Sequence, residues 1–166
     1  VVLDVTEVGR LGEGRVDIAA TQTDAAGNVH EGFAQTAQFT IDTVNPTVGI
    51  TSSQDGLVAY DDANIVTYTL TFAEAVQSVT AADIDVTGAA LDANGDAIYS
   101  VAHTADSASA MVTVTVADNS TDNVEITAKA SIVDIAGNPL ITETHDTQEV
   151  DTLNPTSGTI DIVVSD

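Results

Sequence analysis

The heptapeptide "VTYTLTF" at residues 66–72 alternates between large apolar side chains and threonine. Val66, Tyr68, Leu70 and Phe72 share one face of an extended chain, and the three threonines share the other. A period of two, built from β-branched and aromatic residues, is typical of a strand with one face buried and one face in water. The heptapeptide therefore predicts an antiparallel sheet that packs against something on one side.

The same alternation recurs along the chain. "VTVTV" at 112–116 directs its valines to one face, and "VEITAKASIV" at 124–133 places five apolar residues on one side, namely Val124, Ile126, Ala128, Ala130 and Ile132. Four more strands are predicted between Gly, Asn, Asp and Ser residues, at 47–52, 83–87, 97–103 and 141–150. No segment has helical periodicity over a usable length. Seven short strands in about 100 residues predict an all-β fold, an Ig-like antiparallel β-sandwich.

Two short motifs are written twice in this sequence. "DTVNPT" at 42–47 returns as "DTLNPT" at 151–156, 109 positions later. "DAAGN" at 24–28 returns as "DIAGN" at 134–138, 110 positions later. Self-similarity at a fixed period indicates a repeat architecture. We therefore predict a tandem repeat of about 109 residues.

The repeat sets the expected domain boundaries. Residues 1–44 are expected to be the C-terminal part of a preceding Ig-like repeat, 45–153 a complete repeat, and 154–166 the first strand of the next. Pro46 and Pro155 come just after the repeat junctions. Because proline fixes φ and cannot pair centrally in a sheet, we expect a short, stiff joint at each junction.

The charge of the chain limits its partners. Asp and Glu number 26 against 3 Lys and Arg, which gives a net charge of −23. Such a chain repels nucleic acid and anionic membrane, and the sequence has no apolar run of membrane-spanning length. Cysteine is absent, so packing or metal must provide stability. The acidity suits solubility or a salt-rich habitat, and it also suits carboxylates that bind cations; the two are compatible.

Longer stretches resemble a known group of proteins. "EGRVDIAATQTDAAGN" at 13–28 and "FTIDTVNPT" at 39–47 resemble the final strands of bacterial Ig-like repeats, and "LTFAEAVQSVTAADIDVTGAAL" at 70–91 resembles an earlier part of the same repeats. The resemblance implies a structural extender, or stalk, of a giant cell-surface adhesin that is exported by type I secretion and supports cell adhesion and biofilm formation. It also implies an extracellular location, neighbouring repeats of the same chain as partners, and Ca²⁺ at the joints. Asn45 and Asn154 depart from the pattern, which more often has a small residue before the proline.

The sandwich topology brings one set of oxygen-bearing residues together at the pole where the chain enters the repeat. The loop between the last two strands and the end of the second strand both lie at that pole, so we expect a metal site from Asp42, Asn45, Glu74, Asp134 and Asn138. Carboxylate, amide and carbonyl oxygens are the ligands of Ca²⁺, which takes six to eight of them. In the alternative, Asp134 and Asn138 only make a turn around a glycine with positive φ. Asp83 is a weaker candidate that can equally face solvent.

Two other acidic stretches have open interpretations. Asp151 is expected at the opposite pole, near loop carboxylates that can complete a second site or stay solvated, namely Asp55, Asp61, Asp62, Asp118 and Asp122. "DANGD" at 92–96 matches the first positions of an EF-hand loop, but Ala97 stands where the loop needs glycine and His103 where it needs glutamate. A hairpin turn around Asn94-Gly95 is the favoured interpretation.

Catalytic motifs are not found. His30, His103 and His145 are scattered, and the sequence has no nucleophile elbow, zinc spacing or phosphate loop. We therefore expect no enzyme. "NST" at 119–121 matches a glycosylation sequon, although a turn explains it equally. The alternative function is a carbohydrate- or peptide-binding Ig-like module of an adhesin, or an accessory domain of a secreted enzyme. A binding face needs exposed aromatic side chains, and Tyr60 is the best candidate for one.

Overall fold

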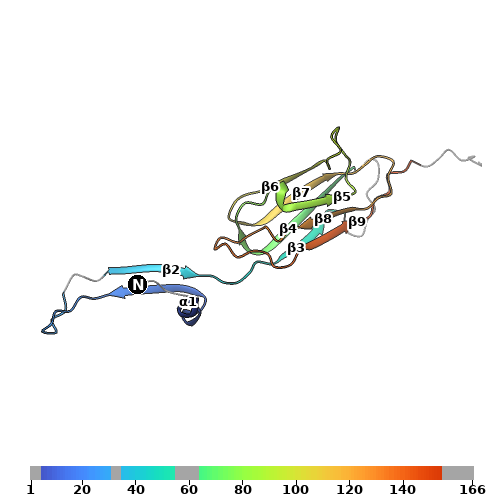
Figure 1. The fold of residues 1–166 in the computed structure, drawn as a ribbon. Coiled ribbons are helices and arrows are strands. Elements are labelled where there is room, and N and C mark those ends of the chain that lie inside the picture. The colour runs from blue at the N-terminus through green and yellow to red at the C-terminus, as the bar shows by residue number, and fades with distance from the viewer. Residues whose placement is uncertain (1–4, 31–34, 55–63, 155–166) are drawn as a thin grey trace, which may run out of the picture. The chain divides into compact units, whose positions relative to one another are not determined.

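The computed structural model describes residues 5–30, 35–54 and 64–154. The chain forms two compact units, Val1–Val44 and Asn45–Asp166. The second unit holds the sandwich that the sequence predicts, and the first unit is built on a two-stranded hairpin (Figure 1).

The described residues of the second unit form seven strands: β3 (Val48–Ser52), β4 (Ile65–Val76), β5 (Ile84–Thr87), β6 (Tyr99–His103), β7 (Ser107–Thr115), β8 (Val124–Ala128) and β9 (Thr144–Gln148). They make a four-stranded sheet in the order β3-β4-β7-β6 and a three-stranded sheet in the order β5-β8-β9, antiparallel throughout. This is the strand order of a constant-type immunoglobulin sandwich, with sheets ABED and CFG. The predicted all-β, Ig-like fold is confirmed.

Several strands differ in length from those predicted, and two of the differences have a clear local cause. β7 starts five residues before the predicted strand 112–116, because Ser107 and Ser109 also pair with β4. β8 ends at Ala128, five residues before its predicted end at 133, because the chain turns at Lys129. Ala130 lies in that turn and is exposed, so its predicted place in the core is wrong.

The core lies between the two sheets and consists of the apolar face of each alternating strand. The four apolar residues of "VTYTLTF" are at most 3% exposed, and the valines of β7 and the inward residues of β8 are buried with them. The sequence alternation therefore identified the core side of these strands. Burying a side chain of this size stabilises the fold by about 1.5–3 kcal/mol relative to exposure.

Two polar contacts tie the sheets together across this core. Tyr68 of β4 is fully buried and donates its hydroxyl to the carbonyl oxygen of Val124 in β8, at 3.0 Å. Ser52 of β3 donates to Oε1 of Gln148 in β9, at 2.6 Å. Burial raises the pKa of Tyr68, so its hydroxyl remains a donor at physiological pH. Tyr68 and Gln148, which are both buried, thus have the hydrogen-bond partners that their burial requires.

Strand β4 breaks its pairing with β7 near its end. The register shifts between Thr71 and Val76, which pairs with Ser107 and also forms an isolated bridge with Asp134. Such a bulge bends a strand and re-aims the side chains inside it. Glu74 is one of those side chains. The sequence showed the strand but not the bulge.

The first unit contains a short helix, α1 (Val5–Leu11), and two antiparallel strands, β1 (Gly14–Ala20) and β2 (Gln35–Ile41). The helix was not predicted, since seven residues are too few for a clear periodicity. Its glycine neighbour, Gly12, has a φ of 76°, the left-handed conformation in which helices commonly end.

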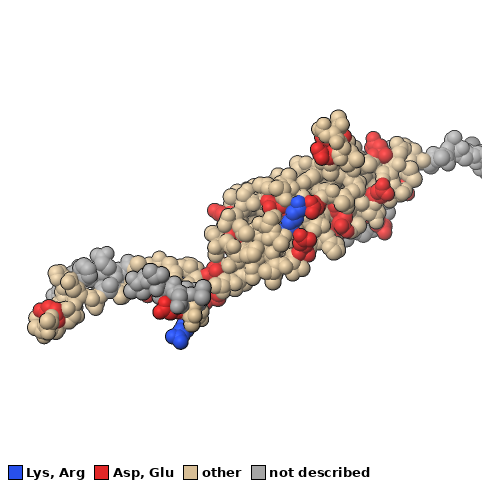
Figure 2. Space-filling view, viewed as in Figure 1, with Lys and Arg blue, Asp and Glu red and all other residues tan. Residues whose placement is uncertain are grey.

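Acidic side chains are spread over the visible face of the second unit, as Figure 2 shows. Residues 45–154 contain a single basic residue of the Lys and Arg type, Lys129. Lys129 binds Asp85 at 2.6 Å and donates to the carbonyl oxygen of Ala82 at 3.1 Å. Among the described residues, no helix is long and apolar enough to cross a membrane.

Candidate metal site

The turn at 134–138 is organised by one buried carboxylate. Oδ1 of Asp134 accepts the backbone N–H groups of Gly137 and Asn138, at 2.7 and 2.8 Å, and Oδ2 accepts the side-chain amide of Asn138 at 2.7 Å. Gly137 has a φ of 99°, so glycine is the residue that fits there without strain. The turn that the sequence offered as an alternative to calcium is therefore formed.

Asp134 stays ionised in spite of its position. Its side chain is fully buried, and burial by itself would raise its pKa. Hydrogen bonds from the Asn138 amide and from the backbone N–H groups of Asn138, Gly137 and Ala136 outweigh burial, and the pKa of Asp134 lies below its ordinary value. The turn thus holds a negative charge at the pole of the sandwich.

The same turn occurs at two other places. In "DAAGN", Asp24 accepts the N–H groups of Ala26 and Asn28 and the amide of Asn28. In "DANGD", Asp92 accepts the N–H groups of Asn94 and Asp96. All three turns have their glycine at positive φ. The predicted hairpin turn around Asn94-Gly95 is confirmed, because Leu91 and Ala97 form an antiparallel bridge across it.

Glu74 supplies a second carboxylate beside this turn. It lies half-buried in the bulged end of β4, and one of its carboxylate oxygens is within 4.8 Å of a carboxylate oxygen of Asp134. The expectation that the end of the second strand returns to the pole of the "DIAGN" turn is confirmed. Two carboxylates at this separation repel each other unless a cation or a proton lies between them.

Asn45 fixes the start of the second unit to the same pole. Its side-chain amide donates to the carbonyl oxygen of Pro139 at 2.7 Å, and Pro139 directly follows Asn138. The asparagine that departs from the family pattern therefore holds the joint segment onto the sandwich. Four of the predicted ligands belong to the second unit at this pole: Asn45, Glu74, Asp134 and Asn138.

Asp42 is the third residue from the end of the first unit and is half-buried. Its Oδ1 accepts the N–H of Val44 at 3.1 Å, as Oδ1 of Asp151 accepts the N–H of Leu153 at 3.2 Å. Both copies of the hexapeptide thus form the same local turn. A carboxylate has about four lone-pair positions on its two oxygens, so this turn and a cation can share one aspartate.

The opposite pole was predicted to join Asp151 to five loop carboxylates. Asp151, Asp118 and Asp122 are exposed, and the described residues show no group of three acidic side chains at that pole that could hold a metal. Three further carboxylates of this prediction lie outside the described residues: Asp55, Asp61 and Asp62.

The threonine of the hexapeptide is a residue whose role the sequence did not reveal. Thr152 is 1% exposed; its hydroxyl donates to the carbonyl oxygen of Ala117 and accepts the N–H of Ser120, at 2.7 and 2.8 Å. In the first copy, Thr43 hydrogen bonds to the carboxylate of Glu13 through both its N–H and its hydroxyl. In each copy the threonine follows the second strand of a hairpin, β2 or β9. It bonds to the segment just before the first strand of that hairpin, β1 or β8. The repetition itself was the signal that could have found this role.

Asp83 has a structural role rather than a solvent-facing one. It accepts the N–H and the hydroxyl of Thr80, both at 2.9 Å, and the hydroxyl of Ser131 at 2.8 Å. It thereby caps a 3₁₀ turn at Ala81–Asp83 between β4 and β5. Burial opposes ionisation of Asp83, but these hydrogen bonds and the charge of Lys129 lower its pKa.

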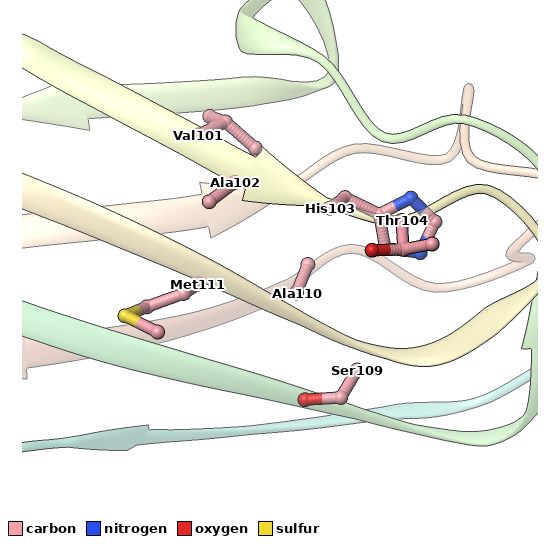
Figure 3. Close-up of a pocket in the computed structure, with 7 residues that line it drawn as sticks. All are labelled: Val101, Ala102, His103, Thr104, Ser109, Ala110 and Met111. Atoms are coloured by element: carbon pink, nitrogen blue, oxygen red, sulfur yellow. The ribbon is translucent and has the colours of Figure 1, made fainter.

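A shallow hollow of about 380 Å³ is the place to look for a ligand of the alternative, binding function. Figure 3 shows that its lining comes from β6, from Thr104 directly after β6, and from β7, and Met111 is 48% exposed there. The lining contains no Phe, Tyr or Trp, and its one ring, that of the half-buried His103, is held by contacts to the N–H of Val79 and the carbonyl oxygen of Ser107. The described aromatic side chains are either buried in the core or half-buried: Phe39, Tyr68, Phe72 and Tyr99. Tyr60, the predicted exposed aromatic, lies outside the described residues.

Comparisons with family models, with curated proteins and with solved structures find no match to this chain. The Ig-like sandwich is therefore established by the strand order of the chain itself.

Proposed function

We propose that residues 45–153 are an extender module of a bacterial cell-surface adhesin, a sandwich of fixed length whose joint to the preceding repeat is stiffened by Ca²⁺. The observation that carries this proposal is the "DIAGN" turn, where a buried, ionised Asp134 lies beside Glu74 at the pole to which Asn45 ties the joint. The protein acts outside the cell, and its partners are neighbouring repeats of the same chain.

Chain connectivity brings Asp42 into reach of this pole. Asp42 precedes Asn45 by three residues, which span at most about 11 Å when fully extended. Asn45 is itself fastened to Pro139, beside Asn138. Within the second unit, Glu74 and Asp134 already bring one carboxylate oxygen of each within 4.8 Å of the other, and in this proposal Asp42 supplies the third carboxylate. Ca²⁺ at this place would be shared between the two units.

The donors suit calcium better than magnesium or zinc. Carboxylate and amide oxygens are hard ligands, and the site has neither cysteine nor histidine. Calcium accepts six to eight oxygens in a flexible shell, whereas magnesium requires an octahedron and retains its water. Three carboxylates with amide and carbonyl oxygens therefore favour calcium, with a dissociation constant on the order of 0.1–1 mM, as in other extracellular modules.

Calcium would also change the mechanics of the joint. A net charge of −23 makes the joint repulsive, most strongly in low salt, where the Debye length is about 30 Å at 0.01 M. Sodium chloride screens this repulsion but supplies no shared ligands. Calcium replaces the repulsion by coordination from both sides and so selects one geometry of the joint.

Calcium titration followed by small-angle scattering tests the proposal on the full chain. The maximum dimension and the flexibility should change with millimolar calcium and should not change with added sodium chloride. Asp42→Ala should abolish the calcium effect. Asp151→Ala is the matched control, because it removes the same carboxylate from the same local turn at the other copy.

Two results would count against calcium at this joint. If calorimetry shows no binding heat up to about 10 mM calcium, the dissociation constant lies above the range of such modules. An equal response of Asp42→Ala and Asp151→Ala would show that the effect is general charge screening.

The alternative is a carbohydrate- or peptide-binding module, for which the hollow beside Met111 is the favouring observation. Its lining offers histidine, serine, threonine and methionine but none of the large aromatic residues, Phe, Tyr or Trp, that stack on sugars. A Met111→Glu variant that leaves adhesion of the whole protein unchanged would remove this candidate.

A further inference from the structure

Hairpin β1–β2 has one apolar face and one polar face. Val16 pairs with Phe39, and Ile18 pairs with Ala37, on one side of the hairpin. This face is open at Ile18, which is 46% exposed, and at the exposed Ala37, whereas Val16 and Phe39 are half-buried. Ile41, at the other end of the same face, is 7% exposed. The opposite side is polar and carries, among others, Arg15, Asp17, Gln38 and Thr40. A sheet with such a pattern normally buries its apolar face against a second layer.

The second unit contains a counterpart of this hairpin in which the face is covered. Counted back from the two Asp-x-Ala-Gly-Asn turns, Val16 and Ile18 correspond to Ile126 and Ala128 of β8. Ile126 and Ala128 are both fully buried. They pack in one core with inward residues of the four-stranded sheet, among them Tyr68, Leu70, Val112 and Val114.

We infer that the apolar face of β1–β2 is a docking surface for the inner face of a four-stranded sheet with the pattern of β3-β4-β7-β6, supplied by a preceding copy of the repeat. The covering layer is thus specified by chemistry: a sheet with alternating valine, leucine and tyrosine toward the hairpin. The inference extends the sheet-to-sheet packing seen in the core of the second unit to the corresponding hairpin of the first unit. It shares the tandem repeat with the proposed function but does not depend on calcium.

The repeat offset says which residues such a covering layer would need. At an offset of 110 positions, Val1 corresponds to Met111, and the residues of the second unit before Met111 are 45–110. The counterpart segment contains β3, β4, β5 and β6 and the first part of β7.

The test adds a second copy of residues 45–110 in front of Val1 of the full chain and measures amide hydrogen exchange in chelator. We expect exchange at Val16 and Ile18 to slow by at least about 100-fold, because opening would then require breaking a sandwich core rather than a lone hairpin. Unchanged exchange at these amides would overturn the inference.

Two charge substitutions on opposite faces of the hairpin provide the matched control. In the extended chain, Ile18→Asp should abolish the slowing, whereas Thr40→Asp should leave it intact. Equal effects of the two substitutions would overturn the docking face. The assay runs without calcium, so its failure is distinct from failure of the calcium joint.

Discussion

The hairpins β1–β2 and β8–β9 carry the same motifs in the same order but differ in what surrounds them. Both are joined through an Asp-x-Ala-Gly-Asn turn with the same three kinds of hydrogen bond to aspartate. Yet Asp24 is exposed and Asp134 is fully buried. The comparison separates what the local sequence can form by itself from what an opposing sheet adds.

The strand register shows the same division. In β8–β9, Ile126 pairs with Asp146, whose counterpart in the first copy is Ala37. In β1–β2, Val16 instead pairs with Phe39, two residues further along. A shift by two keeps every side chain on its face, so the apolar pattern does not forbid it. The turn fixes neither register by itself, whereas a packed core penalises every arrangement except one.

The largest expected difference is in stability, between substitutions on the apolar face of β8 and on the apolar face of β1. Ile126→Ala should destabilise the main unfolding transition by about 2–5 kcal/mol, from lost burial plus a cavity. Ile18→Ala, at the neighbouring position of the other hairpin, should change that transition by less than about 0.5 kcal/mol, as exposed sites do. Urea denaturation of the full chain measures both. Equal effects would mean that the two hairpins share one core.

A somewhat smaller difference is expected between the turn carboxylates. Asp134→Ala removes a fully buried carboxylate and its three hydrogen bonds from Gly137 and the half-buried Asn138, which costs about 1–3 kcal/mol. In Asp24→Ala the donors are exposed and can hydrogen bond to water instead, so the midpoint of the main unfolding transition should not change. Thermal melts in chelator give the comparison without any contribution from metal. A silent Asp134→Ala would show that the turn adds nothing to the stability of the sandwich.

The threonines of the hexapeptide extend the comparison to the ends of the hairpins. Thr152→Val should cost about 1–2 kcal/mol, because the buried hydroxyl satisfies the carbonyl of Ala117 and the N–H of Ser120. Thr43→Val removes a bond to the exposed Glu13 and should leave the main transition in place. Denaturant melts of the two variants decide this, and a larger effect of Thr43→Val would reverse the assigned roles.

The smallest effect is a pH dependence. The pKa of Asp134 is lower in the folded chain than its ordinary value of 3.8. The unfolded chain therefore binds a proton first, and this contribution to stability, present above about pH 4, is lost as the pH falls through the lowered pKa. Melts between pH 6 and pH 2.5 should show a shallower loss in Asp134→Asn than in the natural chain. Identical slopes would assign the acid sensitivity to other groups, such as Asp83, whose pKa is also lowered.

Much of the fold could be predicted from local patterns. Alternation in 66–72 and 112–116 identified buried faces, because a period of two leaves one side of a strand apolar whatever packs against it. The "D-x-A-G-N" turn was equally predictable, since its hydrogen bonds lie within five residues. The strand ends were less accessible. β8 stops at Ala128 although the alternation runs on to Ile132, because the chain turns there.

The candidate site divides in the same way. The sequence by itself determined the residue types, the acidity, the repeated hexapeptide and the turn that keeps Asp134 ionised, because these depend on neighbours in the chain. The expected sandwich topology placed Glu74 at the same pole, but only the tertiary structure decided that a bulge carries it, that Asn45 fastens the joint to Pro139, and that Thr152 is buried. The bulge lies where β4 leaves β7, and the others join residues 94 and 32 to 35 positions apart. Contacts of such separation arise from the packing of the sheets and leave no local pattern to read.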